Sequence, residues 1–212
     1  AGDSPGMRTV VFDIDTQRDF LEPGGALYVP GGETIVPALR RVLRGAHDCR
    51  VPVVASMDAH TTDDPEFAMF PPHCVAGTRG QEKLEETVVG PIRIVGGAAP
   101  AIEPAADETW GLEKRKLSVL EAPAFDVMFA ALRPERAVVV GVATEFCVRA
   151  AALGLRERGV EVVLVTDAIR SVDVSAGERA LAEAGAAGVK LIGVDDALRL
   201  IREGGACGSA DT

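Results

Sequence analysis

The sequence predicts an α/β fold: three layers, α/β/α, around a doubly wound and mainly parallel sheet. Two observations lead to this prediction. Apolar runs of strand length alternate along the chain with segments whose apolar residues recur at helical spacing. The strand-like runs are apolar throughout, which is typical of parallel strands covered on both faces. The 212 residues suffice for one large core, so we expect a single domain over 1–212, with flexible ends at about 1–6 and 204–212.

The first half of the chain should form three strands and one long helix. The helix is the best defined element, because apolar residues recur every three or four positions along one of its faces. The expected elements are strands at Thr9–Phe12, Val51–Ser56 and Val88–Val95, a polar loop over Thr16–Gly32, a helix over Thr34–Ala46, and an irregular segment from Met57 to Gln81. That irregular segment is long for a compact domain, which favours a functional role.

The second half should supply four more strands and four helices. A connection rich in Gly, Ala and Pro, Gly96–Ala106, joins it to the first half. A capping box, Ser175 to Glu178, indicates the start of one helix. The expected elements are strands at Glu113–Leu117, Ala137–Val140, Val160–Thr166 and Val189–Ile192, and helices at Phe125–Leu132, Glu145–Arg158, Ser175–Ala186 and Asp195–Arg202.

The composition argues against several classes of function. A net charge of −10 disfavours nucleic acid and anionic membrane surfaces as partners. No apolar run reaches the ~18 residues that a membrane span needs, and the sequence holds no phosphate-binding loop or serine-hydrolase elbow. The four cysteines, Cys49, Cys74, Cys147 and Cys207, form no C-x-x-C pair, and their spacing suggests neither a zinc ribbon nor a disulfide framework. A reducing cytoplasm fits this cysteine usage best.

Cys147 is the clearest candidate for chemistry. It follows a buried strand, a break at Gly141 and the start of a helix near Glu145. A thiol in the first helical turn lies at the positive end of the helix dipole, which lowers its pKa and favours the thiolate. Free cysteines are also among the most buried residues. From this stretch alone, a nucleophile and an inert core cysteine are equally supported.

Two further segments carry groups that could assist a nucleophile. Asp15 stands just past the first strand, where a carboxylate serves as a general base or, more commonly, as a loop cap. Lys114 and Lys116 lie in one short predicted strand, and strand alternation puts both on the same face. A cation there would stabilise a thiolate or orient a carboxylate. Alternatively, the two lysines would discourage aggregation at an edge strand.

The long segment after the second strand holds a set of oxygen and nitrogen ligands. Asp58 and His60 stand two residues apart, and Glu66 and His73 follow them. Carboxylates mixed with imidazoles are typical of a hydrophilic divalent metal rather than a thiolate zinc site. The alternative is a polar loop with a helix cap and two surface histidines. Because ligands of parallel sheets bind beyond the carboxyl ends of the strands, this segment should converge with the two described above.

Three stretches resemble the signatures of the isochorismatase-like cysteine hydrolases, in the same order and at similar separations: Asp15–Phe20, Lys114–Ser118 and Gly141–Val148. Within that family, Asp58-Ala59-His60 and the block Phe70–Thr78 resemble the metal loop of nicotinamidases. The resemblance covers about Thr9 to Ile192. It implies the α/β/α fold of that family.

The resemblance implies a catalytic triad. Cys147 would be the nucleophile, Asp15 the acid and base, and Lys114 the third member. The resemblance favours Lys114 over Lys116, because the family has a serine or threonine four residues after its lysine, and this chain has Ser118 there.

The same resemblance implies how a substrate would be held. The backbone N–H groups of Ala143 and Cys147 would form the oxyanion hole, beside a non-proline cis peptide between Val142 and Ala143. A flat ring would lie between aromatic side chains. The residues implied to contact the substrate are Phe20, Phe70, Gln17 and Leu27.

One divalent ion is implied by the metal loop. Asp58, His60 and His73 match ligands of the nicotinamidases, and Glu66 stands where many of them have a third histidine, so it would be the fourth ligand. Zn²⁺, Mn²⁺ and Fe²⁺ suit two carboxylates and two imidazoles about equally. By resemblance, the ion would bind a ring nitrogen of the substrate, directly or through water.

The implied reaction is hydrolysis of nicotinamide to nicotinate and ammonia through a thioester on Cys147. The enzyme would be a cytoplasmic homo-oligomer of NAD metabolism, in pyridine nucleotide salvage, with a small amide as its partner and neither nucleic acid nor membrane. Two alternatives remain: a metal-free relative, either isochorismatase or a hydrolase of carbamoyl or ureido compounds, and a non-catalytic binding module on the same fold. The metal loop speaks against the first, and the complete triad speaks against the second.

Overall fold

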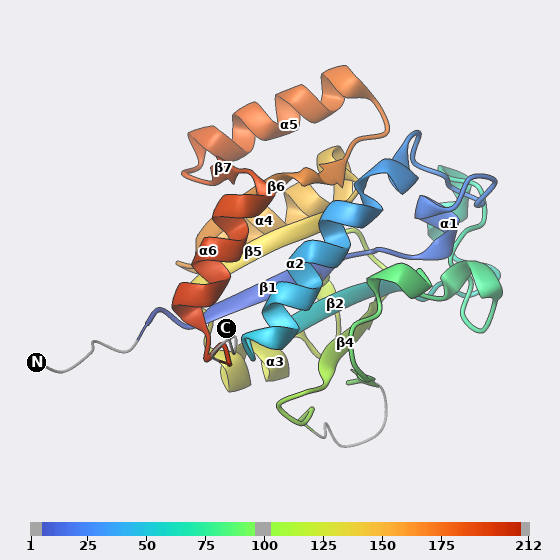
Figure 1. The fold of residues 1–212 in the computed structure, drawn as a ribbon. Coiled ribbons are helices and arrows are strands. Elements are labelled where there is room, and N and C mark those ends of the chain that lie inside the picture. The colour runs from blue at the N-terminus through green and yellow to red at the C-terminus, as the bar shows by residue number, and fades with distance from the viewer. Residues whose placement is uncertain (1–5, 96–102, 209–212) are drawn as a thin grey trace, which may run out of the picture.

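The computed structural model describes residues 6–95 and 103–208, and within them seven strands form one sheet. Every pairing between neighbouring strands is parallel. The order β3-β4-β2-β1-β5-β6-β7 places β2, β3 and β4 on one side of β1 and β5, β6 and β7 on the other (Figure 1), so the predicted doubly wound sheet is confirmed. The strands are β1 (Thr9–Ile14), β2 (Val53–Asp58), β3 (Ile92–Ile94), β4 (Thr109–Lys114), β5 (Arg136–Val142), β6 (Glu161–Arg170) and β7 (Lys190–Ile192).

Helices cover both faces of this sheet and bury two apolar clusters (Figure 1). Successive residues of β1 point to opposite faces, so Phe12 joins one cluster and Val11 the other. The helices are α2 (Val36–Asp48) and α6 (Val194–Gly204) on the face of Val11, and α3 (Phe125–Leu132), α4 (Arg149–Glu157) and α5 (Val174–Ala186) on the face of Phe12. In the described part of the chain, no helix has the length and apolar character needed to cross a membrane.

The helix α2 shows how the sequence specifies this packing. Its buried apolar residues are spaced three and four apart along one face: Leu39, Val42, Leu43 and Ala46. Pro37 stands in the first turn, where a helix has no partner for the N–H that proline lacks. The predicted face is therefore confirmed. The helix begins two residues later than expected, because Gly32–Ile35 forms a separate 3₁₀ turn.

Two segments expected to be irregular contain short helices. The loop after β1 holds α1 (Arg18–Leu21), and the long loop after β2 holds 3₁₀ turns at Pro65–Ala68 and Arg79–Gln81. These elements are too short to show a periodic apolar pattern. The strand β3 is also shorter than the predicted Val88–Val95, and residues 96–102 of the expected connection lie outside the described part of the chain.

The strand predicted at Glu113–Leu117 is wrong in its bounds. Lys114 is the last residue of β4, and Lys116 lies beyond the end of that strand. The side chain of Lys114 is fully buried, whereas that of Lys116 is 72% exposed. The expectation that alternation puts both lysines on one face is therefore wrong. The buried part of β4 includes Gly111, which weakens its apolar pattern in the sequence.

The capping box predicted at Ser175 is also wrong. The helix α5 begins at Val174, and its N-cap is Asp173, whose carboxylate accepts a hydrogen bond from the N–H of Ala176 at 2.7 Å. Aspartate caps a helix as well as serine does, and Asp173 has the extended backbone that an N-cap requires.

The C-terminal segment is tied to the end of α2. Cys49 forms a disulfide with Cys207, 158 residues away, and the N–H of Ala206 donates to the carbonyl of Cys49 at 2.8 Å. The expectation of no disulfide framework is wrong, because a single bond between distant positions leaves no spacing pattern. The segment from Gly204 to Cys207 is held, while residues 1–5 and 209–212 of the expected flexible ends lie outside the described residues.

Candidate active site

Four adjacent strands each place one functional side chain at the carboxyl edge of the sheet. In sheet order these are Lys114 at the end of β4, Asp58 at the end of β2, Asp15 just after β1, and Cys147 just after β5. The doubly wound topology sets these four strands side by side. Segments that are far apart in the sequence therefore meet along one line.

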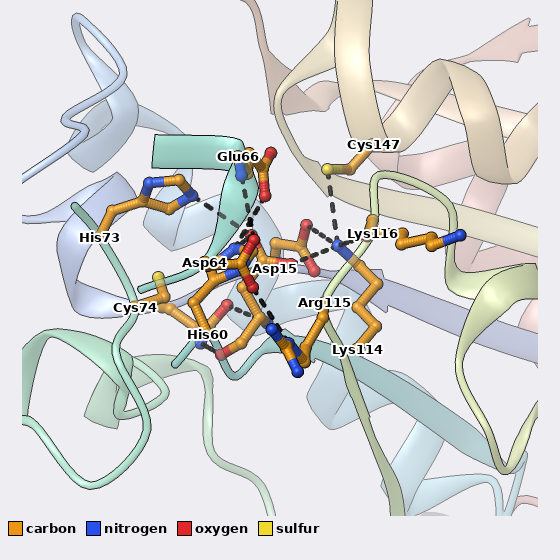
Figure 2. A network of polar contacts seen from close by, with 12 residues as sticks. Asp15, His60, Asp64, Glu66, His73, Cys74, Lys114, Arg115, Lys116 and Cys147 are labelled. Carbon is orange, nitrogen blue, oxygen red and sulfur yellow. Dashed lines mark hydrogen bonds and ion pairs between the residues drawn. The ribbon is translucent and has the colours of Figure 1, made fainter. Parts of the chain in front are cut away.

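Lys114 is the centre of the polar network at this edge (Figure 2). Its Nζ lies 3.0 Å from Asp15 Oδ2, 2.5 Å from Asp58 Oδ1 and 3.7 Å from Cys147 Sγ. It also donates to the backbone carbonyl of Lys116 at 3.0 Å. The structure thus brings together the three residues predicted to be catalytic, all of them buried, while Lys116 contributes only its backbone.

Burial and charge determine which of these groups carry protons. Burial, together with the negative charge of Asp58, raises the pKa of Asp15, although Lys114 opposes this shift. For Cys147, burial and the charge of Asp15 raise the pKa well above that of a free thiol. Burial lowers the pKa of Lys114, but its anionic neighbours outweigh burial and keep the ammonium charged. Burial and the neighbouring carboxylate of Asp15 therefore shift the thiol pKa upward, opposite to the predicted lowering.

A sharp turn between β5 and α4 holds Cys147. Gly141 has a φ of +117°, and a Cβ atom there would overlap the backbone carbonyl of Ile14 in β1, so glycine is required. Cys147 lies in the segment Thr144–Val148, which is kinked by the non-helical backbone of Phe146 and precedes α4. The regular helix α4 therefore begins at Arg149, later than the predicted Glu145, and Cys147 lies before it and not in its first turn. Burial has the largest effect on the thiol pKa, and the charge of Asp15 is the next largest.

The predicted cis peptide between Val142 and Ala143 is present. The carbonyl of Ala143 accepts hydrogen bonds from the N–H groups of Phe146 at 3.0 Å and Val148 at 3.2 Å, which closes the turn around Cys147. Ala143 and Cys147 both border the cavity described below. Their role as oxyanion donors stays a prediction.

The predicted metal ligands form a second cluster beside the triad. Asp58, His60 and His73 bring one ligand atom each within 4.8 Å of one another, which suits a single ion. Nε2 of His60 lies 3.4 Å from Asp58 Oδ2 and 3.1 Å from Glu66 Oε2, and Nε2 of His73 lies 3.7 Å from Asp58 Oδ2. Asp58 joins this cluster to the triad, because its other oxygen contacts Lys114.

The donors of this cluster fit a divalent cation. Within the residues that the structure describes, Nε2 of His60 is buried and has no hydrogen-bond partner, although the carboxylates of Asp58 and Glu66 lie close to it. A buried polar atom without a partner typically costs about 1–3 kcal/mol. A cation at this point would give the nitrogen a partner and reduce the repulsion between the carboxylates. The set of two imidazoles and two carboxylates is also chemically suited to such an ion.

A cavity of about 260 Å³ lies at the meeting point of the triad and the metal cluster. Asp15 and Cys147 of the triad border it, and so do Asp58, Glu66 and His73 of the metal cluster. Most of the remaining wall is aliphatic or aromatic. Cys147 and the predicted ligand cluster therefore face one largely apolar space.

The family of the chain is decided by a match over most of its length. Residues 9–196 match the model of the isochorismatase domain. The chain belongs to the isochorismatase family of hydrolases. The seven-stranded parallel sheet with helices on both faces agrees with the solved structures of isochorismatase-like hydrolases.

Several members of this family are similar to the chain. The nicotinamidase/pyrazinamidase of Mycobacterium tuberculosis is 29% identical over 199 residues, which are 88% of this chain and 98% of that protein. The nicotinamidase of Escherichia coli is 25% identical over 207 residues, with coverages of 86% and 93%. A solved pyrazinamidase of Pyrococcus horikoshii in complex with zinc has a TM-score of 0.73 at 29% identity and covers 88% of this chain and 99% of its own. The predicted resemblance, nearest to nicotinamidases, is confirmed.

The isochorismatase-family site contains most of the residues predicted to contact a substrate. Those that border the cavity are Phe20, Leu27 and Phe70. Gln17 is placed differently: it is buried, and its amide makes three 2.8 Å hydrogen bonds, to the N–H and carbonyl of Asp58 and to the carbonyl of Gln81. The structure therefore places Gln17 behind the site, where it holds the end of β2.

Sequence reasoning missed several residues of this site. Val29, Leu117, Phe146 and Val172 also line the cavity. Phe146 precedes Cys147 and could have been found as a neighbour of the nucleophile. Val172 has no local signal, because it follows β6 and reaches the site only through the fold. Its N–H donates to the carboxylate of Glu145 at 2.9 Å, which ties that loop to the turn carrying Cys147.

Proposed function

We propose that this protein is a nicotinamidase, which hydrolyses nicotinamide to nicotinate and ammonia. The observation that carries the proposal is the meeting of a Cys-Asp-Lys triad and a metal-ligand cluster at one largely apolar cavity. A thiol suits attack on an amide carbonyl, and a cavity lined by aromatic side chains suits a flat ring. The similarity to relatives named nicotinamidase, at 25–29% identity, supports the same reaction.

The reaction begins with transfer of the Cys147 proton to the carboxylate of Asp15, whose raised pKa makes it a stronger base than an exposed aspartate. The thiolate attacks the amide carbon, and the carbonyl electron pair moves onto oxygen. The N–H groups of Ala143 and Cys147 would stabilise this oxyanion, and losing one such donor typically costs about 3 kcal/mol. Lys114 stays cationic and balances the negative charge that passes between sulfur and carboxylate.

Collapse of the tetrahedral intermediate breaks the C–N bond. Asp15 gives its proton to the departing nitrogen, which leaves as ammonia, and a thioester remains on Cys147. Water then attacks the thioester carbon while Asp15 takes one of its protons. The second collapse releases nicotinic acid, and the same proton returns to sulfur. One carboxylate beside the thiol therefore serves both half-reactions as acid and as base.

Asp58, His60, Glu66 and His73 would hold one divalent ion. When bound, the ion supplies a ligand position for the ring nitrogen of the substrate, which selects heteroaromatic amides and orients the carbonyl toward Cys147. The zinc complex of the Pyrococcus horikoshii relative supports zinc, while the donor set suits manganese and iron as well. Protons compete with a metal for imidazole, so binding should weaken as the pH falls.

The test combines His73→Ala with two amides, nicotinamide and benzamide, which differ in the ring nitrogen. We expect the wild type to release ammonia faster from nicotinamide than from benzamide. The variant should lose bound metal and most of this preference, and chelation of the wild type should have the same effect. Full metal occupancy in the variant would exclude His73 as a ligand. An equal loss of activity on both amides would show that the ion does not recognise the ring nitrogen.

The same assays separate this proposal from its alternatives. Hydrolysis of carbamoyl or ureido compounds in place of nicotinamide, unaffected by chelation, would favour a metal-free relative. Binding of nicotinamide without ammonia release would favour a binding module. The cytoplasmic location, the homo-oligomer and the role in pyridine nucleotide salvage stay predictions, which cell fractionation, light scattering and growth on nicotinamide would check.

A further inference from the structure

Asp64 is a buried carboxylate next to the metal cluster, and it contacts two of the proposed ligands without being one of them (Figure 2). Its Oδ2 lies 3.1 Å from Nδ1 of His60. Its Oδ1 accepts a hydrogen bond from the N–H of Glu66 at 3.1 Å, which caps the 3₁₀ turn Pro65–Ala68. One side chain therefore reaches the ring of the first ligand and the backbone of the second.

The two nitrogens of His60 face different partners. Nδ1 points to Asp64, whereas Nε2 points to Asp58 and Glu66 and is buried without a hydrogen-bond partner among the described residues. A carboxylate that accepts a hydrogen bond from Nδ1 fixes the tautomer that leaves a lone pair on Nε2. Metal-binding histidines commonly have such a partner on the ring nitrogen that does not bind the metal.

Arg115 holds this carboxylate from the other side. Its Nε donates to Asp64 Oδ2 at 3.0 Å, and its Nη2 donates to Thr61 Oγ1 at 3.1 Å. Arg115 directly follows Lys114, the last residue of β4. The guanidinium therefore attaches the metal loop to the same strand end that carries the triad lysine.

We propose that Asp64 is the positioning residue of the metal site, and that Arg115 holds it in place. The carboxylate sets the ring of His60 through Nδ1 and the backbone of Glu66 through its N–H. Asp64 acts through these ligands and not as a ligand itself, because its Oδ2 already contacts His60 and Arg115. This inference rests on the proposed metal site.

The variant Asp64→Asn tests the inference with little change in shape. In this variant the amide oxygen can still accept the hydrogen bond from the N–H of Glu66. The amide NH₂ group then replaces Oδ2 and faces Nδ1–H of His60 and Nε–H of Arg115, which are also donors and cannot bond to it. The histidine then avoids the clash by carrying its proton on Nε2, the nitrogen that must bind the metal. We expect the Kd for Zn²⁺, measured by competition with a chromophoric chelator, to rise about 10- to 100-fold, as is typical when such a partner is lost.

Asp63→Asn is the matched control. It removes the same charge one residue away, from an exposed side chain. Screening by water and salt should keep its effect on the Kd within about twofold. Arg115→Gln is a second variant that leaves the cap intact, and it should weaken Zn²⁺ binding less than Asp64→Asn does. Circular dichroism of each metal-free variant checks that the fold is retained.

NMR of the imidazole nitrogens of the zinc-loaded wild type gives a readout independent of activity. A proton on Nδ1 of His60 and zinc on Nε2 would support the inference, and zinc on Nδ1 would overturn it. Equal Kd values for Asp64→Asn and Asp63→Asn, or no change in either, would also overturn it while leaving the metal site in place. Failure of the wild type to bind Zn²⁺ would instead overturn the proposed metal site, and this inference with it.

Discussion

Two buried lysines, Lys114 and Lys83, contact carboxylates in or just after β1, and they differ in their surroundings. Nζ of Lys114 contacts two carboxylates, and Asp15 and Cys147 beside it border a cavity of about 260 Å³. Nζ of Lys83 contacts one carboxylate, Asp13, at 2.5 Å, and the hydroxyls of Thr16 and Thr87 at 2.6 and 2.5 Å. The space next to Lys83 measures only about 10 Å³, barely enough for one water.

Charge balance separates the two sites further. The pKa of Lys114 is raised well above its usual value, because its anionic neighbours outweigh burial. The pKa of Lys83 is lowered, because burial outweighs the single carboxylate of Asp13. Burial alone therefore does not identify a catalytic lysine. Lys114 has more charged partners than Lys83, and a cavity borders two of its neighbours, whereas Lys83 fastens the long loop to β1.

The largest effect should come from the thiol beside Lys114. Cys147→Ala removes the covalent nucleophile, so ammonia release from nicotinamide should fall by several powers of ten. Substrate binding and the circular dichroism spectrum should stay close to those of the wild type, because the smaller side chain leaves the cavity walls in place. A variant that keeps more than about one hundredth of the wild-type activity would contradict the assignment of the nucleophile.

The next effect separates Lys114 from Lys116. Lys114→Ala should lower kcat/KM by about 100-fold or more, because it removes the cation between Asp15, Asp58 and Cys147. Lys116→Ala should change kcat/KM little, since that side chain is 72% exposed. A larger loss of kcat/KM for Lys116→Ala than for Lys114→Ala would contradict the assignment of Lys114 as the third member of the triad.

Lys83→Met should affect stability rather than catalysis. It leaves the carboxylate of Asp13 buried without its cation, which typically costs about 3–5 kcal/mol of the free energy of unfolding. The double variant Asp13→Val with Lys83→Met should recover much of this loss, because an apolar pair needs no charge balance. Urea unfolding measures both values. A large fall in kcat/KM of the correctly folded Lys83→Met variant would show that Lys83 also contributes to catalysis and would contradict its purely structural role.

The smallest effect is a pH dependence with opposite signs for the two lysines. The pKa of Lys83 is lower in the folded protein than its usual value of 10.5. Between these two pKa values the unfolded chain binds more protons than the folded chain, so rising pH stabilises the protein. The pKa of Lys114 is raised, so its contribution is lost as the pH rises above 10.5. The destabilisation by Lys83→Met should therefore be larger near pH 10 than near pH 7. Urea unfolding at the two pH values measures the difference, and a smaller destabilisation at the higher pH would contradict it.

The sequence by itself determined the fold class, the approximate positions of most strands and the segments that carry the candidate site. These features depend on local patterns. Strands buried on both faces are apolar throughout, a helix on a sheet repeats its apolar residues every three or four positions, and a nucleophile on a turn stands between a strand and a helix. Asp15, Cys147 and the metal loop could be selected for that reason.

Only the tertiary structure decided which of these residues meet and which protons they carry. The order β4-β2-β1-β5 sets Lys114 beside Asp58 and Asp15, and the end of β4 at Lys114 leaves the side chain of Lys116 in solvent. Burial reversed the expected pKa shift of the thiol. The bond between Cys49 and Cys207 joins positions 158 residues apart. Each of these properties depends on contacts between distant segments and on exclusion of water, which exist only once the chain has folded.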